Sequence, residues 1–198
     1  MQLFEIINIS QFSRDNPRNW RPHVLAVMAL LLSGCLVQAV KQENLKDPAL
    51  TRIHQAFVTT VNRAQSDSQR AWQNGRLGNM VVNIIGGENV GLCYQWQELV
   101  YVGIQPALRQ TGWQARGISI NKGTFFEHHA VVVYNPNISS PDTLLQKPDQ
   151  QGVYVLDPWE SGKANIYTLS DWLKKPWVIE VPAKITNLRQ FTITGYKP

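Results

Sequence analysis

The spacing of apolar residues changes near Gly112, and this change constrains the fold more than any other feature of the chain. Before Gly112, apolar residues recur at steps of three and four, which predicts amphipathic helices over about 48–71 and 93–110. After it come short β-branched and aromatic runs, which predict strands. The expected strands are Gly117–Ile120, Ala130–Tyr134, Val153–Leu156, Trp177–Ile179 and Phe191–Ile193. Helices followed by consecutive strands predict an α+β domain in which the helix that begins at Cys93 packs on an antiparallel sheet.

Composition and charge narrow the classes of protein that fit. The 198 residues suffice for one domain with a sizeable core, and 43% hydrophobic with 17% charged residues is typical of a globular chain. The formal net charge of +5 is spread along the chain without a run of four basic residues. We therefore expect no nucleic-acid partner and attribute the charge to solubility or to an anionic envelope surface.

The N-terminal part has the order of a secretory signal: basic residues, an apolar run and then small residues. The basic residues are Arg14, Arg18 and Arg21. The apolar run, Val24–Leu32, is far shorter than the ~20 residues that a membrane-spanning helix needs. The residues Leu32-Ser33-Gly34-Cys35 resemble the lipobox of bacterial lipoproteins, which implies a lipid on Cys35.

These features predict three segments: a lipoprotein signal peptide over 1–34, a short tether over 35–47 and the α+β domain over 48–198. The lipobox resemblance implies membrane attachment through palmitate-type acylation in the bacterial cell envelope, with the domain facing the periplasm or the surface. Leu36 stands where some bacteria place an inner-membrane retention aspartate, so the outer membrane is favoured.

One set of residues can carry nucleophilic chemistry. Cys93 follows Gly91-Leu92 at the expected start of a helix, where unsatisfied amides and the helix dipole stabilise a thiolate. A thiolate nucleophile needs an imidazole to move the proton and a carboxylate to orient that imidazole. His128 and His129 stand at the start of one expected strand, and Asp157 follows the end of the next. In an antiparallel pair these ends meet, and because adjacent strand residues point to opposite faces, only one histidine can join.

Three stretches together resemble the core of the transglutaminase-like (papain-like) cysteine protease superfamily. They are Gly91–Trp96, the histidine before the valines at 131–133, and Val155–Trp159. More narrowly, the pattern resembles uncharacterised bacterial lipoproteins with a Cys-His-Asp triad. The resemblance covers about 88–160 and implies a cysteine that opens a helix packed on an antiparallel sheet.

The resemblance also implies a role for each residue of the triad. Cys93 would be the nucleophile, His128 the base and acid, and Asp157 the residue that orients the imidazole. The lipoprotein-like form places the histidine directly after glutamate, which aligns His128, whereas the widespread form places it before alanine, which aligns His129 as the alternative base.

The sequence contains no clear upstream glutamine or aromatic residue for an oxyanion hole. The candidates that we consider for this role are Asn89, Asn83, and the backbone amide of Cys93 together with water. In the expected fold, two polar segments flank the cleft: the loop over 86–90, and the proline-containing segment over 135–151, which predicts a long hairpin loop between two strands.

The function that these features predict is that of a cysteine-dependent peptidase or amidase, or of a transglutaminase-like acyltransferase, acting on peptide or isopeptide bonds without a cofactor or metal. Its partner would be a peptide or protein substrate, for example a cell-wall peptide, with water or an amine as the acyl acceptor. The sequence leaves the substrate, the acceptor and the oligomeric state open.

Two alternatives remain. Cysteine, histidine and aspartate also bind zinc, although only one of the adjacent histidines could take part. The other alternative is a non-catalytic envelope lipoprotein on the same scaffold, in which tryptophans line a peptide- or glycan-binding groove. Those tryptophans are Trp96, Trp113, Trp159, Trp172 and Trp177.

Overall fold

The structure is a computed structural model that describes residues 39–40, 45–124, 126–175, 178 and 183–188. These residues all belong to one unit, Val37–Pro198. The predicted signal peptide, Cys35 and the strand predicted at Phe191–Ile193 lie outside the described residues, as do Trp177 and Ile179 of another predicted strand. Within the described part of the chain, no helix combines the length and apolar character that a membrane span requires.

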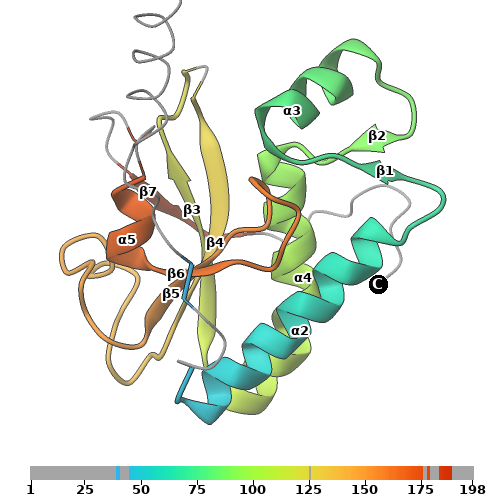
Figure 1. The fold of residues 1–198 in the computed structure, drawn as a ribbon. Helices are drawn as coiled ribbons and strands as arrows, with labels where there is room; N and C mark the ends of the chain where they lie inside the picture. The colour runs from blue at the N-terminus through green and yellow to red at the C-terminus, as the bar shows by residue number, and fades with distance from the viewer. Residues whose placement is uncertain (1–38, 41–44, 125, 176–177, 179–182, 189–198) are drawn as a thin grey trace, which may run out of the picture. The chain divides into compact units, whose positions relative to one another are not determined.

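The described unit is a mixed α+β fold, as the change in periodicity predicts (Figure 1). Its helices are α2 (Pro48–Gln65), α3 (Gly75–Ile84), α4 (Cys93–Thr111) and α5 (Leu169–Leu173). Five strands form an antiparallel sheet in the order β6-β5-β4-β3-β7: β3 (Gln114–Ile120), β4 (His128–Tyr134), β5 (Val153–Leu156), β6 (Ile166–Thr168) and β7 (Lys184–Thr186). Two short strands, β1 (Ala71–Trp72) and β2 (Asn89–Val90), pair in parallel.

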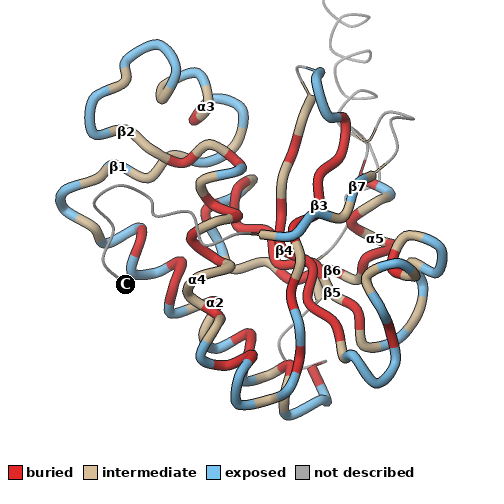
Figure 2. The backbone as a smooth tube through the Cα atoms, turned by 180° about the vertical axis from the view of Figure 1, so that it is seen from behind, coloured by how far each residue is buried: buried red, intermediate tan, exposed pale blue. Residues whose placement is uncertain are grey.

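The sheet separates two groups of buried side chains, which appear as red segments of the tube in Figure 2. On one face, α2 and α4 pack together with Val131 and Val133 of β4. On the other, Val132 and Tyr134 of the same strand pack with α5. Because both faces of β4 are covered, its valine run is buried throughout.

Local sequence explains where the two long helices begin and end. Asp47 caps α2 by accepting hydrogen bonds from the backbone amides of its first turn. The helix ends at Gln65 rather than at 71, because the buried apolar stripe stops at Ala64 and polar residues follow. The helix α4 begins at Cys93, as predicted, and ends before Gly112, whose φ of 74° is the left-handed conformation that glycine favours.

The segment at α3 differs from expectation. The sequence analysis predicts a short apolar segment and a tight loop there, yet the segment forms a helix of ten residues, of which only Gly78 is buried. Its larger apolar side chains, Leu77, Met80 and Ile84, are exposed, so their spacing does not mark a core stripe. The prediction also misses β6 and β7, because each has only three residues and carries little periodicity.

Candidate active site

His128 and Asp157 form a buried pair where β4 begins and β5 ends. The register pairs Val131 with Leu156, so Asp157 follows the last residue of β5 beside the start of β4. Nε2 of His128 lies 2.8 Å from Oδ2 of Asp157, and both side chains are almost fully excluded from solvent. The antiparallel hairpin predicted from the sequence brings these two residues together.

Further donors surround the Asp157 carboxylate. Nε1 of Trp172 donates to Oδ2 at 2.7 Å, and the buried Lys175 ammonium donates to the same oxygen at 3.2 Å. The backbone amide of Trp159 donates to Oδ1 at 3.3 Å. Lys175 also donates to Glu160 at 2.8 Å. This arrangement holds the carboxylate in one position and leaves it ionised.

The electrostatics of the pair favour opposite charges on the two side chains. Burial by itself lowers the pKa of His128, but the charge and hydrogen bond of Asp157, with a contribution from Cys93, raise that pKa to about 9. Burial raises the pKa of Asp157, and this is outweighed by His128, Lys175 and Trp172, which hold the pKa well below its usual range. His128 is therefore protonated and Asp157 ionised at neutral pH.

Cys93 lies beside this pair at the first residue of α4. Its Sγ is 3.9 Å from the backbone oxygen of Glu127, and the residue is only 7% exposed. The second ring nitrogen of His128, Nδ1, is buried without a hydrogen-bond partner among the described residues. Because Cys93 is close enough to raise the pKa of His128, this nitrogen is the one available to the thiol.

His129 occupies a different position from His128. Its Nε2 lies 2.8 Å from Oε1 of Glu127, its side chain is 22% exposed, and burial lowers its pKa. The structure therefore brings His128, and not His129, into contact with Asp157. The catalytic roles of Cys93, His128 and Asp157 stay predictions.

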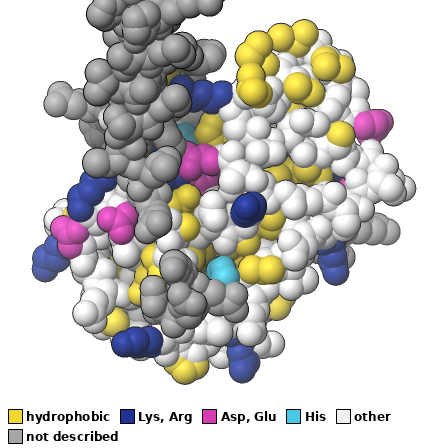
Figure 3. Space-filling view, in the orientation of Figure 1, with side chains coloured by type: hydrophobic (Ala, Val, Ile, Leu, Met, Phe, Trp, Pro, Cys, Tyr) yellow, Lys and Arg dark blue, Asp and Glu magenta, His cyan; other side chains and the backbone are white. Residues whose placement is uncertain are grey.

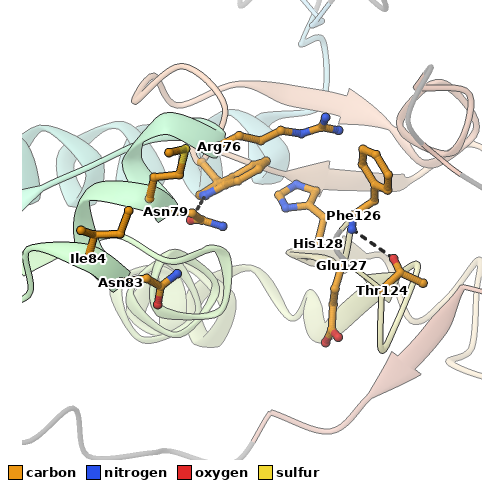
Figure 4. Close-up of a pocket in the computed structure, with 10 residues that line it drawn as sticks. Arg76, Asn79, Asn83, Ile84, Thr124, Phe126, Glu127 and His128 are labelled. Atoms are coloured by element: carbon orange, nitrogen blue, oxygen red, sulfur yellow. Dashed lines mark hydrogen bonds between the residues drawn. The ribbon is translucent and has the colours of Figure 1, made fainter.

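A cavity of about 340 Å³ opens between α3 and the start of β4 (Figure 4). Its lining residues are Arg76, Asn79, Met80, Asn83, Ile84, Thr124, Phe126, Glu127, His128 and Trp159. The loops predicted to flank the cleft, 86–90 and 135–151, contribute no lining residue, so that expectation is wrong for this cavity. The longer loop leaves β4 at Tyr134, at the opposite end of the strand from His128.

The asparagines considered for the oxyanion hole have different surroundings. The Asn89 amide donates to the backbone of Gly86 and accepts a hydrogen bond from Gln73, so it is used in the β1–β2 region. Asn83 lines the cavity as an exposed side chain. Asn79, which the sequence analysis does not single out, also lines it, and its Oδ1 accepts a hydrogen bond from Nε1 of Trp159 at 3.1 Å. That bond orients the Asn79 amide so that its NH₂ group faces away from the indole.

The structure also bears on the two alternatives. Trp96, Trp113, Trp159 and Trp172 are all buried, and of these four Trp159 lines the cavity. The Trp159 ring packs against the His128 ring in a tilted arrangement, with ring centroids 4.5 Å apart. Among the described residues, no group of three or more His, Cys, Asp or Glu side chains is arranged to hold a metal ion.

Sequence reasoning misses the residues that support the pair from further along the chain. Trp172 and Lys175 reach Asp157 only because the chain turns back after β6 through α5. The aromatic residues at 159 and 172 carry a signal of burial but none of position.

Comparisons of the chain with models of protein families, with curated proteins and with solved structures give no match.

Proposed function

We propose that this protein is a cysteine-dependent acyl-transfer enzyme of transglutaminase-like type that acts on amide bonds. The observation that carries the proposal is the buried His128–Asp157 pair, whose remaining imidazole nitrogen has no partner among the described residues and lies near Cys93. A nucleophile, a proton carrier and an orienting carboxylate are the parts that such chemistry needs.

The first half of the reaction forms an acyl-enzyme. The Cys93 thiolate attacks the carbonyl carbon of the amide, and the carbonyl π electrons move to oxygen as the C–S bond forms. When the carbonyl reforms, the C–N bond breaks and the proton on His128 passes to the leaving nitrogen, which departs as an amine. The raised pKa of His128 supports this role, because the imidazole carries a proton at neutral pH.

The second half releases the acyl group. His128 takes a proton from water or from an acceptor amine. At the same time, the oxygen of the water or the nitrogen of the amine attacks the thioester carbon. The C–S bond then breaks, the thiolate returns and His128 is again protonated. Water gives hydrolysis and a carboxylic acid, whereas an amine gives a new amide.

Asn79 is the donor that we assign to the developing oxyanion. Its Oδ1 is occupied by Trp159, its NH₂ group faces away from that indole, and the side chain lines the cavity that reaches His128. Figure 4 shows Asn79 on α3 across the cavity from His128. A preorganised amide donor of this kind stabilises negative charge on the carbonyl oxygen.

The setting of this enzyme is proposed from the N-terminal sequence alone. The basic, apolar and small residues that end in Leu32-Ser33-Gly34-Cys35 support a lipid-anchored protein of the bacterial envelope, with the outer membrane favoured. A peptide of that compartment, such as a cell-wall peptide, is the substrate class that fits the location.

Acylation by p-nitrophenyl acetate tests the proposal on the full chain. We expect release of p-nitrophenolate and an acetyl adduct in the intact mass of the wild type, with both lost in Cys93→Ala. That variant retains Cys35, so it reports acylation at the other cysteine. Equal adduct formation in wild type and Cys93→Ala would overturn the proposal and favour the non-catalytic binding protein.

A further inference from the structure

The helix α3 presents large apolar side chains to solvent. More than half of the side chain is exposed at Leu77, Met80 and Ile84 of the helix and at Ile85 directly after it. In the space-filling view, hydrophobic atoms gather over this part of the molecule (Figure 3). A cluster of exposed large apolar residues at one short helix is typical of a surface that binds an apolar ligand or partner.

Two of these side chains also line the cavity that reaches His128. Met80 and Ile84 are four residues apart, so they lie on the same side of α3, and both belong to the cavity wall. Leu77 and Ile85 are not among the lining residues. The exposed apolar surface of α3 is therefore continuous with the candidate active site along one side of the helix.

Two charged residues of the cavity wall, Arg76 and Glu127, each contact a neighbouring group. The Arg76 guanidinium lies over the Phe126 ring, 4.5 Å from its centroid. The Glu127 carboxylate accepts hydrogen bonds from His129 and from the backbone of Gly123. Figure 4 shows Phe126 on the opposite side of the cavity from α3. Within this wall, Met80 and Ile84 offer apolar contact and Asn79 and Asn83 offer amide groups, while Arg76 and Glu127 each contact a neighbouring group.

We propose that Met80 and Ile84 form a subsite for a bulky apolar side chain of the acyl donor, next to the carbonyl that Cys93 attacks. The occupant is a side chain such as leucine, which the cavity volume of about 340 Å³ can hold. This inference rests on the proposed function and names the substrate class of the same site: amides or esters whose acyl group carries an uncharged apolar side chain.

Neighbouring isoleucines provide a matched test. Ile84 is 75% exposed and lines the cavity, whereas Ile85 is 69% exposed and does not. The experiment measures kcat/KM of the full chain for the p-nitrophenyl esters of N-acetyl-leucine and of acetate, and takes the ratio. We expect Ile84→Ser to lower this ratio about 10-fold, Met80→Ser to lower it in the same direction, and Ile85→Ser to leave it unchanged.

The outcomes separate this inference from the function on which it rests. If the wild type hydrolyses both esters through Cys93 and Ile84→Ser leaves the ratio unchanged, the subsite is wrong and the proposed function stands. If Ile84→Ser and Ile85→Ser lower the ratio equally, the subsite is also wrong, because a residue outside the cavity then matters as much as one that lines it. If neither ester reacts through Cys93, the proposed function and the subsite fall together.

Discussion

The two walls of the candidate cleft are built in opposite ways. On one side, His128 and Asp157 are buried at the ends of two inner strands of a sheet that is covered on both faces, and each hydrogen bond of the carboxylate comes from inside the fold. On the other side, α3 buries only Gly78 and exposes most of its apolar residues. The comparison indicates that the core holds the candidate reacting groups, while the proposed substrate surface on α3 is mostly exposed and adds little to the core.

The largest effect should separate the two adjacent histidines. His128→Ala should lower the rate of acylation by p-nitrophenyl acetate at least about 100-fold, because it removes the imidazole that transfers the proton. His129→Ala should change it little, because that ring bonds Glu127 instead. A rate that falls in His129→Ala and not in His128→Ala would show that the base is His129, as the widespread form of the superfamily aligns it.

Removal of Asp157 should destabilise the core wall strongly. Asp157→Ala leaves the His128 imidazolium and the Lys175 ammonium buried without their shared carboxylate. We expect the free energy of unfolding in urea to fall by about 3–5 kcal/mol. Asp149→Ala, at an exposed aspartate, is the matched control and should change it by less than about 0.5 kcal/mol. Equal stability of the two variants would contradict the charged pair.

On the α3 wall, a substitution should affect catalysis without affecting the thiol. Asn79→Ala should slow acylation by p-nitrophenyl acetate about 100-fold, because the transition state loses an oxyanion donor. Its rate of alkylation by iodoacetamide should remain that of the wild type, because alkylation develops no oxyanion. Asn83→Ala is the control on the next turn of α3. Loss of both reactivities in Asn79→Ala would assign the residue a structural role.

The smallest effect concerns the part of the pH dependence of stability that the His128–Asp157 pair contributes. The raised pKa of His128 stabilises the folded state fully below the unfolded value of about 6.5, and this contribution is lost as the pH rises through about 9. The lowered pKa of Asp157 stabilises it above about 3.9 and the contribution is lost as the pH falls further. Urea midpoints should therefore be highest between about pH 4 and 6.5 and decline toward pH 9. A midpoint that stays constant from pH 5 to pH 9 would argue against the ion pair.

The sequence predicts the core wall better than the α3 wall, and the reason is physical. Runs of β-branched and aromatic residues bounded by turn residues predict the β4–β5 hairpin, and the hairpin alone places His128 beside Asp157. Gly91-Leu92 predicts the start of α4 at Cys93. In contrast, α3 buries no apolar stripe, so its periodicity carries no information about where it packs.

Local sequence patterns do not predict contacts between residues that are far apart in the chain. Lys175 lies near Asp157 and Glu160 because the chain folds back after α5, a long-range event that leaves no spacing in the sequence. The hydrogen bond between Trp159 and Asn79 likewise joins residues 80 positions apart. The signal peptide, the lipid on Cys35 and the assignment to a superfamily stay predictions.

The long loop between β4 and β5 offers a position for protein engineering. It leaves the sheet at the end of β4 opposite His128, and it is anchored by the fully buried Leu144. Beyond that anchor, Gln146, Lys147 and Asp149 are exposed. Exposed polar loop positions of this kind tolerate inserted sequence. An affinity tag inserted between Gln146 and Lys147 would attach the molecule to a support with its cleft directed away from the point of attachment.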